Sequence, residues 1–274
     1  MRSQVEKASA FRALHERERA FIIPNPWDIG TARLLEQLGF EALATTSAGF
    51  AFSIGQRDYN LSRDQTIAHA ASIVAATDLP VSADLENGFG DAPETVSETI
   101  RLAAAAGLAG CSIEDTTGRP GAPIYEFEVA VERVRAAAET VRSLPSGFTL
   151  TARAENFLWG RRDLGDTIKR LQAYQEAGAD VLYAPGLPSK NEIAAVVSSV
   201  ERPVNVVMGL KGPNFSLAEL SEIGVKRISV GSALARAAFG AFLRAARELR
   251  EHGTFSFAAE AVSYAEINEM FKPT

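Results

Sequence analysis

The sequence predicts a single α/β domain folded as a (β/α)8 barrel, the TIM barrel. Three observations carry this prediction: eight short apolar segments alternate with longer segments of helical periodicity, glycines separate several helices from the next strand, and no Pro-, Gly- or Ser-rich linker divides the 274 residues. Eight strand–helix units favour a closed barrel over an open sheet, and single barrels of about 250 residues are common. We therefore expect residues 1–274 to form one domain, with a C-terminal helical extension from about residue 232.

The eight apolar segments are the predicted strands. They span residues 20–26, 40–47, 80–86, 110–115, 148–153, 179–185, 202–208 and 225–231. Strands that are buried on both faces, as in a parallel sheet, lose the polar alternation of half-exposed strands. Pro80 and Pro203 stand at the starts of two of them, where a missing N–H group is tolerated.

The segments between the strands carry helix signals. Residues 31–38, 96–106 and 129–141 have apolar residues at helical spacing. Glycines that suit a left-handed helix end precede four strands, at Gly39, Gly107, Gly178 and Gly224. Residues that suit helix N-caps stand at Asp28, Asp163, Ser189 and Ser216. The aromatic residues after Gly253 are expected to pack on the barrel or on a partner subunit.

Composition and charge indicate a soluble cytoplasmic protein that binds neither membranes nor nucleic acid. The net charge is −6 and the 28 Lys and Arg residues are scattered, unlike a phosphate-backbone footprint. No apolar run approaches the ~18 residues of a membrane span, and the charged N-terminus lacks a signal core. The one cysteine, Cys111, excludes an internal disulfide, fits a reducing compartment and is interpreted as a core residue.

Acidic residues crowd the carboxyl ends of two neighbouring strands, where barrel enzymes build their active sites. Asp84 and Glu86 are two residues apart, so we expect them to share one face of a strand, with Glu114 on the next strand. Such a cluster needs a compensating cation, and oxygen ligands without a nearby His or Cys set favour Mg²⁺ over zinc. The structural alternative is that these acids pair with Arg153 and with helix N-termini.

Other polar residues at the same predicted rim are candidates for substrate binding. Arg153 ends strand five, and its guanidinium suits a substrate carboxylate; a salt bridge to Glu114 or Glu155 is the alternative. Asn205 lies in predicted strand seven. The turn at 46–49 offers backbone N–H groups and hydroxyls, either as an anion-binding nest or as a tight turn.

Some chemistries are disfavoured. No Lys ends a predicted strand, and Lys211 lies in the loop after strand seven, which argues against a Schiff-base aldolase. The three histidines, His15, His69 and His252, are interpreted as surface or packing residues.

Several segments resemble motifs of the isocitrate lyase/phosphoenolpyruvate mutase superfamily, over almost all of residues 20–240. Residues 25–43 (NPWDIGTARLLEQLGFEAL) resemble the first strand and helix of that superfamily, and residues 45–58 (TTSAGFAFSIGQRD) resemble its Ser-Gly…Leu-Gly-x-x-Asp segment. This resemblance implies a substrate-binding turn at Thr46, Ser47 and Ala48, with Asp58 as the acidic residue at the end of the segment.

Three further motifs extend the resemblance. Residues 83–90 (ADLENGFG) resemble the Asp-x-Asp-x-Gly-Tyr-Gly metal motif, which implies Asp84 as a direct ligand and an outer role for the longer Glu86. Residues 113–117 (IEDTT) resemble the strand-four Glu-Asp, so Glu114 would hold a metal-bound water. Residues 151–157 (TARAENF) resemble the Ala-Arg motif, in which Arg153 would bind a substrate carboxylate. The resemblance also implies Mg²⁺, a swapped eighth helix and a homodimer or homotetramer.

The loop after strand four departs from the superfamily pattern. Its sequence, TTGRPGAPIYEFE, lacks the Lys-Lys/Arg-Cys-Gly-His motif of the isocitrate and methylisocitrate lyases and the Lys and Asn of the mutase and phosphonopyruvate hydrolase. Pro185 stands where relatives place His or Glu. Arg119 and Tyr125 are therefore the predicted loop contacts, with Tyr125 as a proton donor.

These observations predict a lyase that depends on Mg²⁺, with Mn²⁺ as an alternative ion. It would form or consume the enolate of a 2-oxo acid by cleaving a C–C bond, as in oxaloacetate decarboxylation or the cleavage of a 2-oxo or 2-hydroxy dicarboxylate. Arg153, Glu114 and Tyr125 are the predicted catalytic residues, and Asn205 joins the substrate-binding turn. The alternatives are a P–C bond mutase or hydrolase acting on phosphonopyruvate, and a weakly catalytic 2-oxo acid binding protein.

Overall fold

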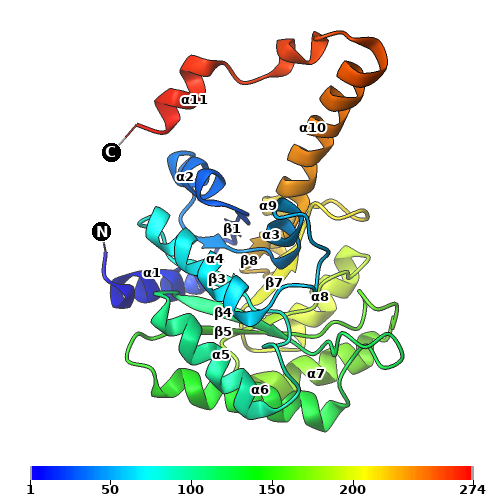
Figure 1. Ribbon diagram of the computed structural model, residues 1–274. Coiled ribbons are helices and arrows are strands. Elements are labelled where there is room, and N and C mark those ends of the chain that lie inside the picture. The colour runs from blue at the N-terminus through cyan, green and yellow to red at the C-terminus, as the bar shows by residue number, and fades with distance from the viewer. Residues whose placement is uncertain (1, 273–274) are drawn as a thin grey trace.

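A computed structural model describes residues 2–272 and contains eight parallel strands surrounded by helices (Figure 1). The strands are β1 (Phe21–Ile23), β2 (Leu43–Ala44), β3 (Val81–Asp84), β4 (Gly110–Glu114), β5 (Thr149–Arg153), β6 (Val181–Tyr183), β7 (Val204–Val207) and β8 (Arg227–Ser229). They pair in the order β1-β8-β7-β6-β5-β4-β3-β2. Between β1 and β2, the Ala44 N–H donates to the Pro24 carbonyl over 3.0 Å. The predicted (β/α)8 barrel is confirmed.

Helices connect the strands and cover the barrel. They are α1 (Gln4–Glu16), α2 (Ile29–Gln37), α3 (Ser47–Ser53), α4 (Arg63–Ala76), α5 (Pro93–Ala105), α6 (Phe127–Ser143), α7 (Leu164–Ala177), α8 (Lys190–Ser198), α9 (Leu217–Glu222), α10 (Ala233–His252) and α11 (Tyr264–Met270), with a 3-10 helix η1 (Ser256–Glu260). All four predicted N-caps accept a backbone hydrogen bond from the first turn of their helix. All four predicted helix-ending glycines have positive φ. No helix within residues 2–272 is long and apolar enough to span a membrane.

The amino ends of the strands are closed by α1. Phe11 and Leu14 of this helix are buried against Phe21 and Ile23 of β1. Gly110 at the start of β4 makes this approach possible, because a Cβ there would lie 2.6 Å from the Thr149 carbonyl and 3.1 Å from the Phe11 ring. Any ligand therefore enters the barrel from the opposite end, where the carboxyl ends of the strands lie.

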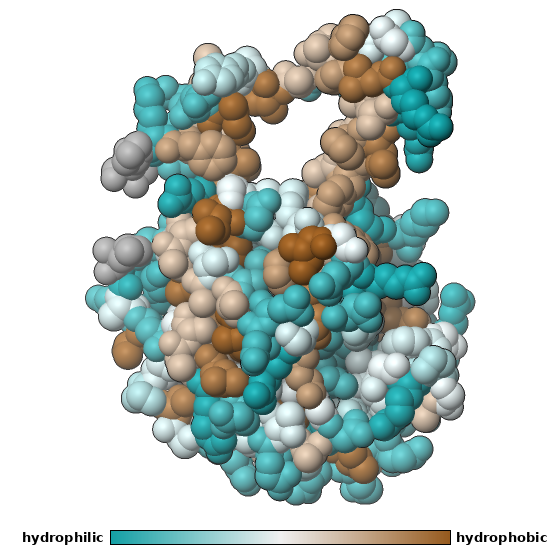
Figure 2. All heavy atoms as spheres, viewed as in Figure 1, coloured by the Kyte–Doolittle hydropathy of each residue, from teal (hydrophilic) through white to brown (hydrophobic). Residues whose placement is uncertain are grey.

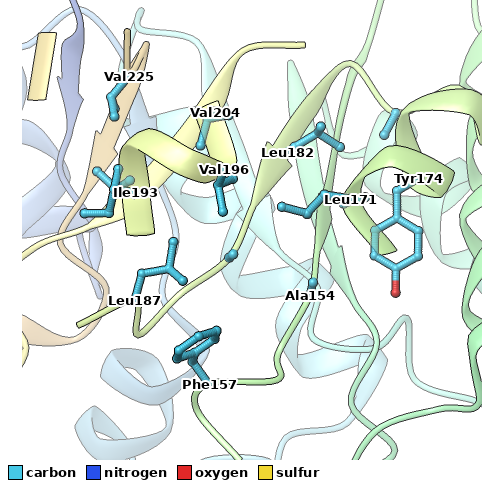
Figure 3. Close-up of a cluster of buried hydrophobic side chains, with 14 of the residues drawn as sticks. Ala154, Phe157, Leu171, Tyr174, Leu182, Leu187, Ile193, Val196, Val204 and Val225 are labelled. Atoms are coloured by element: carbon cyan, nitrogen blue, oxygen red, sulfur yellow. The ribbon is translucent and has the colours of Figure 1, made fainter. Parts of the chain in front are cut away.

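The largest core cluster lies between the barrel wall and α7 and α8 (Figure 3). Leu171 and Tyr174 of α7 and Ile193 of α8 pack against Leu182 of β6 and Val204 of β7. This packing fixes β5, β6 and β7, whose inward-facing side chains contribute to the cavity described below. Cys111 is fully buried in the neighbouring cluster, as predicted.

The helix that follows β8 projects away from the barrel. Helix α10 begins at Ala233 and runs away from the strands, with η1 and α11 as a projecting arm (Figure 1). All twenty residues of α10 are described, and Ala235 alone among them is buried. Phe242 is 67% exposed, and Figure 2 shows apolar side chains along the arm. The chain therefore does not cover its own barrel with this helix.

Candidate active site

A cavity of about 260 Å³ opens at the carboxyl ends of the strands. It is smaller than the roughly 300–1,000 Å³ of pockets that hold drug-sized ligands, so it suits a small molecule. All six predicted substrate-binding residues line it: Thr46, Ser47, Ala48, Asp58, Arg153 and Asn205. Asp84 and Glu114 line it as well.

Asp84 lies at the end of β3, where it faces the turn that begins α3. The Ser47 hydroxyl lies 3.0 Å from Asp84 Oδ2 and 3.2 Å from Asp58 Oδ1, and the Ser47 N–H donates to Asp84 Oδ2 over 3.3 Å. Thr46 caps α3 by accepting a hydrogen bond from Gly49. Of the two interpretations of the turn at 46–49, the structure therefore shows a helix start whose first N–H is directed at a carboxylate.

Arg153 lies at the centre of the acidic groups. Its guanidinium forms ion pairs with Asp84 at 3.1 Å, with Glu114 at 2.9 Å and with Glu155 at 2.9 Å. The salt bridges that the sequence offered as an alternative role are thus present, on a side chain that also lines the cavity. The pKa of Arg153 is raised because these three carboxylates outweigh the effect of burial.

The expectation that Glu86 shares a strand face with Asp84 is wrong. Strand β3 ends at Asp84, and Glu86 has a positive φ of 49°, which turns the chain out of the alternation of a strand. Glu86 is buried, does not line the cavity, and its Oε1 has no hydrogen-bond partner among the described residues. Burial, then the nearby Asp84 and Asp58, raise the pKa of Glu86 to about 8. The Glu86 side chain thus lies near Asp84 and Asp58, but it does so from the turn after β3 and not from the strand itself.

Tyr59 was missed in the sequence. Its hydroxyl donates to Glu114 Oε1 over 3.0 Å, while Arg153 holds Glu114 Oε2, so both oxygens of this buried carboxylate are bound. Burial raises the pKa of Glu114. Tyr59 follows Asp58 directly and has a positive φ of 61°, a conformation that a sequence pattern does not reveal for an aromatic residue. Its place beside the predicted Asp58 was the one available signal.

The predicted loop contacts need a correction. Tyr125 does not line the cavity: its hydroxyl donates to Asp91 over 2.6 Å, and its ring packs on the Arg133 guanidinium at 4.3 Å. Arg119 pairs with the same Asp91 at 2.7 Å. These contacts hold both side chains against the start of α5, so neither meets a ligand in this conformation. Among the described tyrosines, Tyr59 and Tyr183 are the ones that line the cavity.

The donor set fits a hard cation bound mainly through water. Within residues 2–272, no three His, Cys, Asp or Glu side chains are arranged to ligate one ion directly. A single carboxylate facing the cavity at the end of β3, Asp84, with further acids beyond it, would suit Mg²⁺, which usually retains several waters. One Glu86 oxygen has no hydrogen-bond partner among the described residues, and burial, followed by the nearby Asp84, raises the pKa of Glu86 and of Asp58. A cation beside these acids would favour their charged forms.

Comparison with known proteins identifies the class of enzyme. The family model for phosphoenolpyruvate phosphomutase matches residues 11–250. An uncharacterized protein of Mycobacterium tuberculosis is 32% identical over 264 residues, 94% of each chain. The 2,3-dimethylmalate lyase of Eubacterium barkeri is 30% identical over 227 residues, 79% of this chain and 77% of the relative. The chain therefore belongs to the phosphoenolpyruvate mutase/isocitrate lyase superfamily and is an enzyme of that superfamily.

Solved structures agree with this assignment. A "putative lyase/mutase" from Burkholderia cenocepacia J2315 is 65% identical, with a TM-score of 0.96 over 98% of this chain and 97% of that one. Oxaloacetate acetylhydrolase in complex with oxalate is 26% identical, with a TM-score of 0.87 over 97% and 94%. Phosphonopyruvate hydrolase in complex with oxalate and Mg²⁺ is 26% identical, with a TM-score of 0.85 over 96% and 94%.

Proposed function

We propose that this protein is a Mg²⁺-dependent lyase that cleaves a C–C bond in a 2-oxo acid or a related dicarboxylate, through an enolate. The observation that carries the proposal is the group of Asp58, Asp84 and Glu86 beside a small cavity, with one Glu86 oxygen unpaired and the Glu86 pKa at about 8. Burial, then the charge of Asp84, raise the pKa of Asp58 and of Glu86. Carboxyl groups perturbed in this way are a common sign of a functional site, and a cation would relieve the repulsion.

Asp84 would hold the ion directly, and Glu86 and Glu114 would hold it through water. A bound divalent cation supplies Lewis-acid stabilisation of an oxyanion, an effect of several kcal/mol. Mn²⁺ has similar ligand preferences and is the alternative ion.

The protein groups have separate tasks. Arg153 keeps three carboxylates close together, and its stacking on the Tyr183 ring at 5.0 Å fixes its plane. The Ser47 N–H and hydroxyl orient Asp84, and the adjacent Ala48 leaves room in the cavity for the carboxylate of the ligand. Tyr59 orients Glu114 by donating a hydrogen bond to it. Asn205 contributes an amide on the far wall.

The relatives support a lyase activity and, as a second candidate, P–C bond chemistry. One relative is a 2,3-dimethylmalate lyase, and an oxaloacetate acetylhydrolase of similar structure binds oxalate, a small dicarboxylate. The similarity to phosphonopyruvate hydrolase, and the family model named for the phosphomutase, favour P–C bond chemistry as the second candidate.

The test is turnover of a substrate panel followed by NMR. Oxaloacetate, 2,3-dimethylmalate, 2-methylisocitrate and phosphonopyruvate are each incubated with the protein and Mg²⁺, with and without EDTA. We expect cleavage of a C–C substrate that EDTA and Asp84→Ala abolish, while Asp64→Ala, at an exposed acid on α4, leaves the rate unchanged.

Three outcomes would overturn the proposal. Turnover that survives both EDTA and Asp84→Ala would exclude the metal-dependent reaction. Turnover of phosphonopyruvate alone would establish P–C chemistry. Saturable binding of 2-oxo acids without any turnover would establish a binding protein.

We further propose that the chain functions as a homodimer or homotetramer. Helix α10 presents Phe242, Leu243 and Leu249 to solvent, and Ile22 of β1 is 36% exposed on the barrel. A second copy that exchanges this helix would cover both surfaces.

A further inference from the structure

Arg227 on β8 is a buried cation inside the barrel. It is 5% exposed and reaches across the interior, where its Nε–H donates to Asn205 Oδ1 over 2.8 Å and its Nη2 donates to Thr151 Oγ1 on β5 over 3.0 Å. Both acceptors are neutral. The barrel therefore holds a full positive charge in its interior without a charged partner in these two contacts.

The third contact of Arg227 is also neutral. His15 of α1 lies with its Nδ1 2.8 Å from the Phe11 carbonyl and its Nε2 3.4 Å from Arg227 Nη1. A carbonyl can only accept, so Nδ1 carries the proton and Nε2 presents its lone pair to the guanidinium. Burial, then the charge of Arg227, lower the pKa of His15 to about 3, which keeps the ring neutral. His15 thus positions Arg227 without balancing its charge.

No Asp or Glu side chain in residues 2–272 forms an ion pair with Arg227, in contrast to Arg153 and Arg170. Arg153 pairs with three carboxylates, and the buried Arg170 pairs with Asp115 and Asp166. The buried Arg133 also lacks an ion pair among these residues, but it donates to the backbone carbonyls of Asn87, Gly90 and Asp91. Burial lowers the pKa of Arg227 to about 10, so the guanidinium stays charged at neutral pH. A buried charge without a counter-ion is costly, and an anionic ligand that reached Arg227 would offset this cost.

Arg227 is accessible from the candidate active site. It lines the same cavity, together with the hydroxyls of Ser82, Ser112 and Ser229. A guanidinium has five N–H donors, and the three contacts above use three of them. One N–H on each terminal nitrogen is left for a ligand. The cavity is therefore acidic at its mouth, around Asp58 and Asp84, and cationic at its floor.

We propose that Arg227 forms an anion-binding subsite at the floor of the cavity, which holds a carboxylate group of the ligand. The sequence favoured Arg153 for this task, yet Arg153 is already paired with three carboxylates, whereas Arg227 has none. The surrounding hydroxyls supply further donors to the same carboxylate. The proposal rests on the proposed function for the identity of the natural ligand, and its charge argument is independent of the reaction.

The test compares dicarboxylates with monocarboxylates of equal chain length by isothermal titration calorimetry. Malonate, succinate and glutarate are titrated against propionate, butyrate and valerate, with the full-length protein in the presence of Mg²⁺. In the wild type we expect at least one dicarboxylate to bind about tenfold or more tightly than its monocarboxylate, since hydrogen bonds to charged groups are strong. Arg227→Gln should remove this preference, and Arg202→Gln, at an exposed arginine, should keep it.

A second variant guards against loss of folding in Arg227→Gln. Asn205→Asp places an isosteric carboxylate on the Arg227 Nε–H, so the guanidinium gains an internal counter-ion. The hydrogen bond that the Asn205 amide donates to Ser229 is then reversed, with the Ser229 hydroxyl as the donor. We expect this variant to fold and to lose the dicarboxylate preference. The proposal is overturned if the wild type shows no preference, or if a folded Arg227→Gln or Asn205→Asp protein retains it. A purely structural link between α1 and β8 would give that last result, with a lower melting temperature for Arg227→Gln.

The result of this binding test can be distinguished from the result of the substrate panel that tests the proposed function. An Arg227-dependent preference without any turnover of the substrate panel would leave the anion subsite standing and remove the lyase. Mg²⁺-dependent turnover with an unchanged preference in Arg227→Gln would do the reverse.

Discussion

Tyr59 connects the loop after α3 to Glu114 through one hydroxyl. Because a hydrogen bond to a charged group is worth about 1.5–3 kcal/mol, Tyr59→Phe is expected to lower kcat/KM for the substrate identified in the panel by about tenfold or more. Misoriented Glu114 should also weaken the apparent affinity for Mg²⁺, an effect that a loss of packing alone would not produce. Tyr264→Phe, at a Tyr that is 85% exposed, is the matched control. Unchanged kcat/KM in Tyr59→Phe would contradict this role.

The raised pKa of Glu86 predicts how the stability of the protein changes with pH. Its pKa of about 8 lies above the ~4.3 of an unfolded chain, so the folded protein binds the extra proton between these values. Stability without metal should therefore fall as the pH rises from about 5 to about 8, because the unfolded state gives up this proton first. Glu86→Gln removes that contribution and should lose less stability over the same range, by at least about 1 kcal/mol, since one pKa unit corresponds to about 1.4 kcal/mol.

Urea unfolding in EDTA at several pH values measures this difference. Asp64→Asn, at an exposed acid, should follow the wild type throughout. Parallel pH curves for the wild type and Glu86→Gln would show that Glu86 ionises normally and would remove the main support for the metal site.

At the scale of single elements, the fit of α1 against the barrel depends on Gly110. Its replacement by Ala puts a methyl group 2.6 Å from the Thr149 carbonyl of β5 and 3.1 Å from the Phe11 ring, so either β4 or α1 must move. Overpacking of this kind costs about 1–3 kcal/mol in the free energy of unfolding, which denaturant titration measures. Gly121→Ala is the control, since its added Cβ meets nothing within 4 Å. Equal stability of the two variants would contradict a tight α1–barrel contact.

The elements could be predicted from the sequence because their signals are local. The caps at Asp28 and Ser216 and the helix end at Gly178 depend on a few neighbouring residues, and each was confirmed. The strands were also located, although they are shorter than the apolar segments: β2 is Leu43–Ala44 within the predicted 40–47. The polar residues that line the cavity could be predicted because several of them stand at the carboxyl ends of the strands.

The predictions that failed concerned residues whose positions depend on backbone turns or on contacts with residues distant in the sequence. Strand alternation was extended beyond Asp84, but the positive φ of Glu86 ends it there. Tyr125 was assigned by its place in a loop, whereas Asp91, thirty-four residues earlier, determines where its hydroxyl points. Arg227 begins a strand and carries no motif, so its contacts with His15 and Thr151 were invisible in the sequence.

At the scale of the whole molecule, the exposed apolar arm predicts self-association. In a dimer or tetramer that buries α10, an aspartate at position 242 would have to be desolvated, so Phe242→Asp should shift the protein towards the monomer. Sedimentation velocity measures the change, with Ser198→Asp at an exposed position of α8 as the control. A monomeric wild type, or an unchanged oligomer in Phe242→Asp, would contradict the proposed exchange of helices.

The junction between β1 and β2 has a further consequence for how the cavity opens. One backbone hydrogen bond, from Ala44 to Pro24, crosses it, and the Asn25 side chain adds a bond to the Thr45 carbonyl while accepting from Val230 and Gly231. The turn at 46–49, which lines the cavity, follows β2 directly. Separation of β1 from β2 would thus break the Ala44–Pro24 and Asn25–Thr45 hydrogen bonds and widen the entrance without breaking any other strand pair.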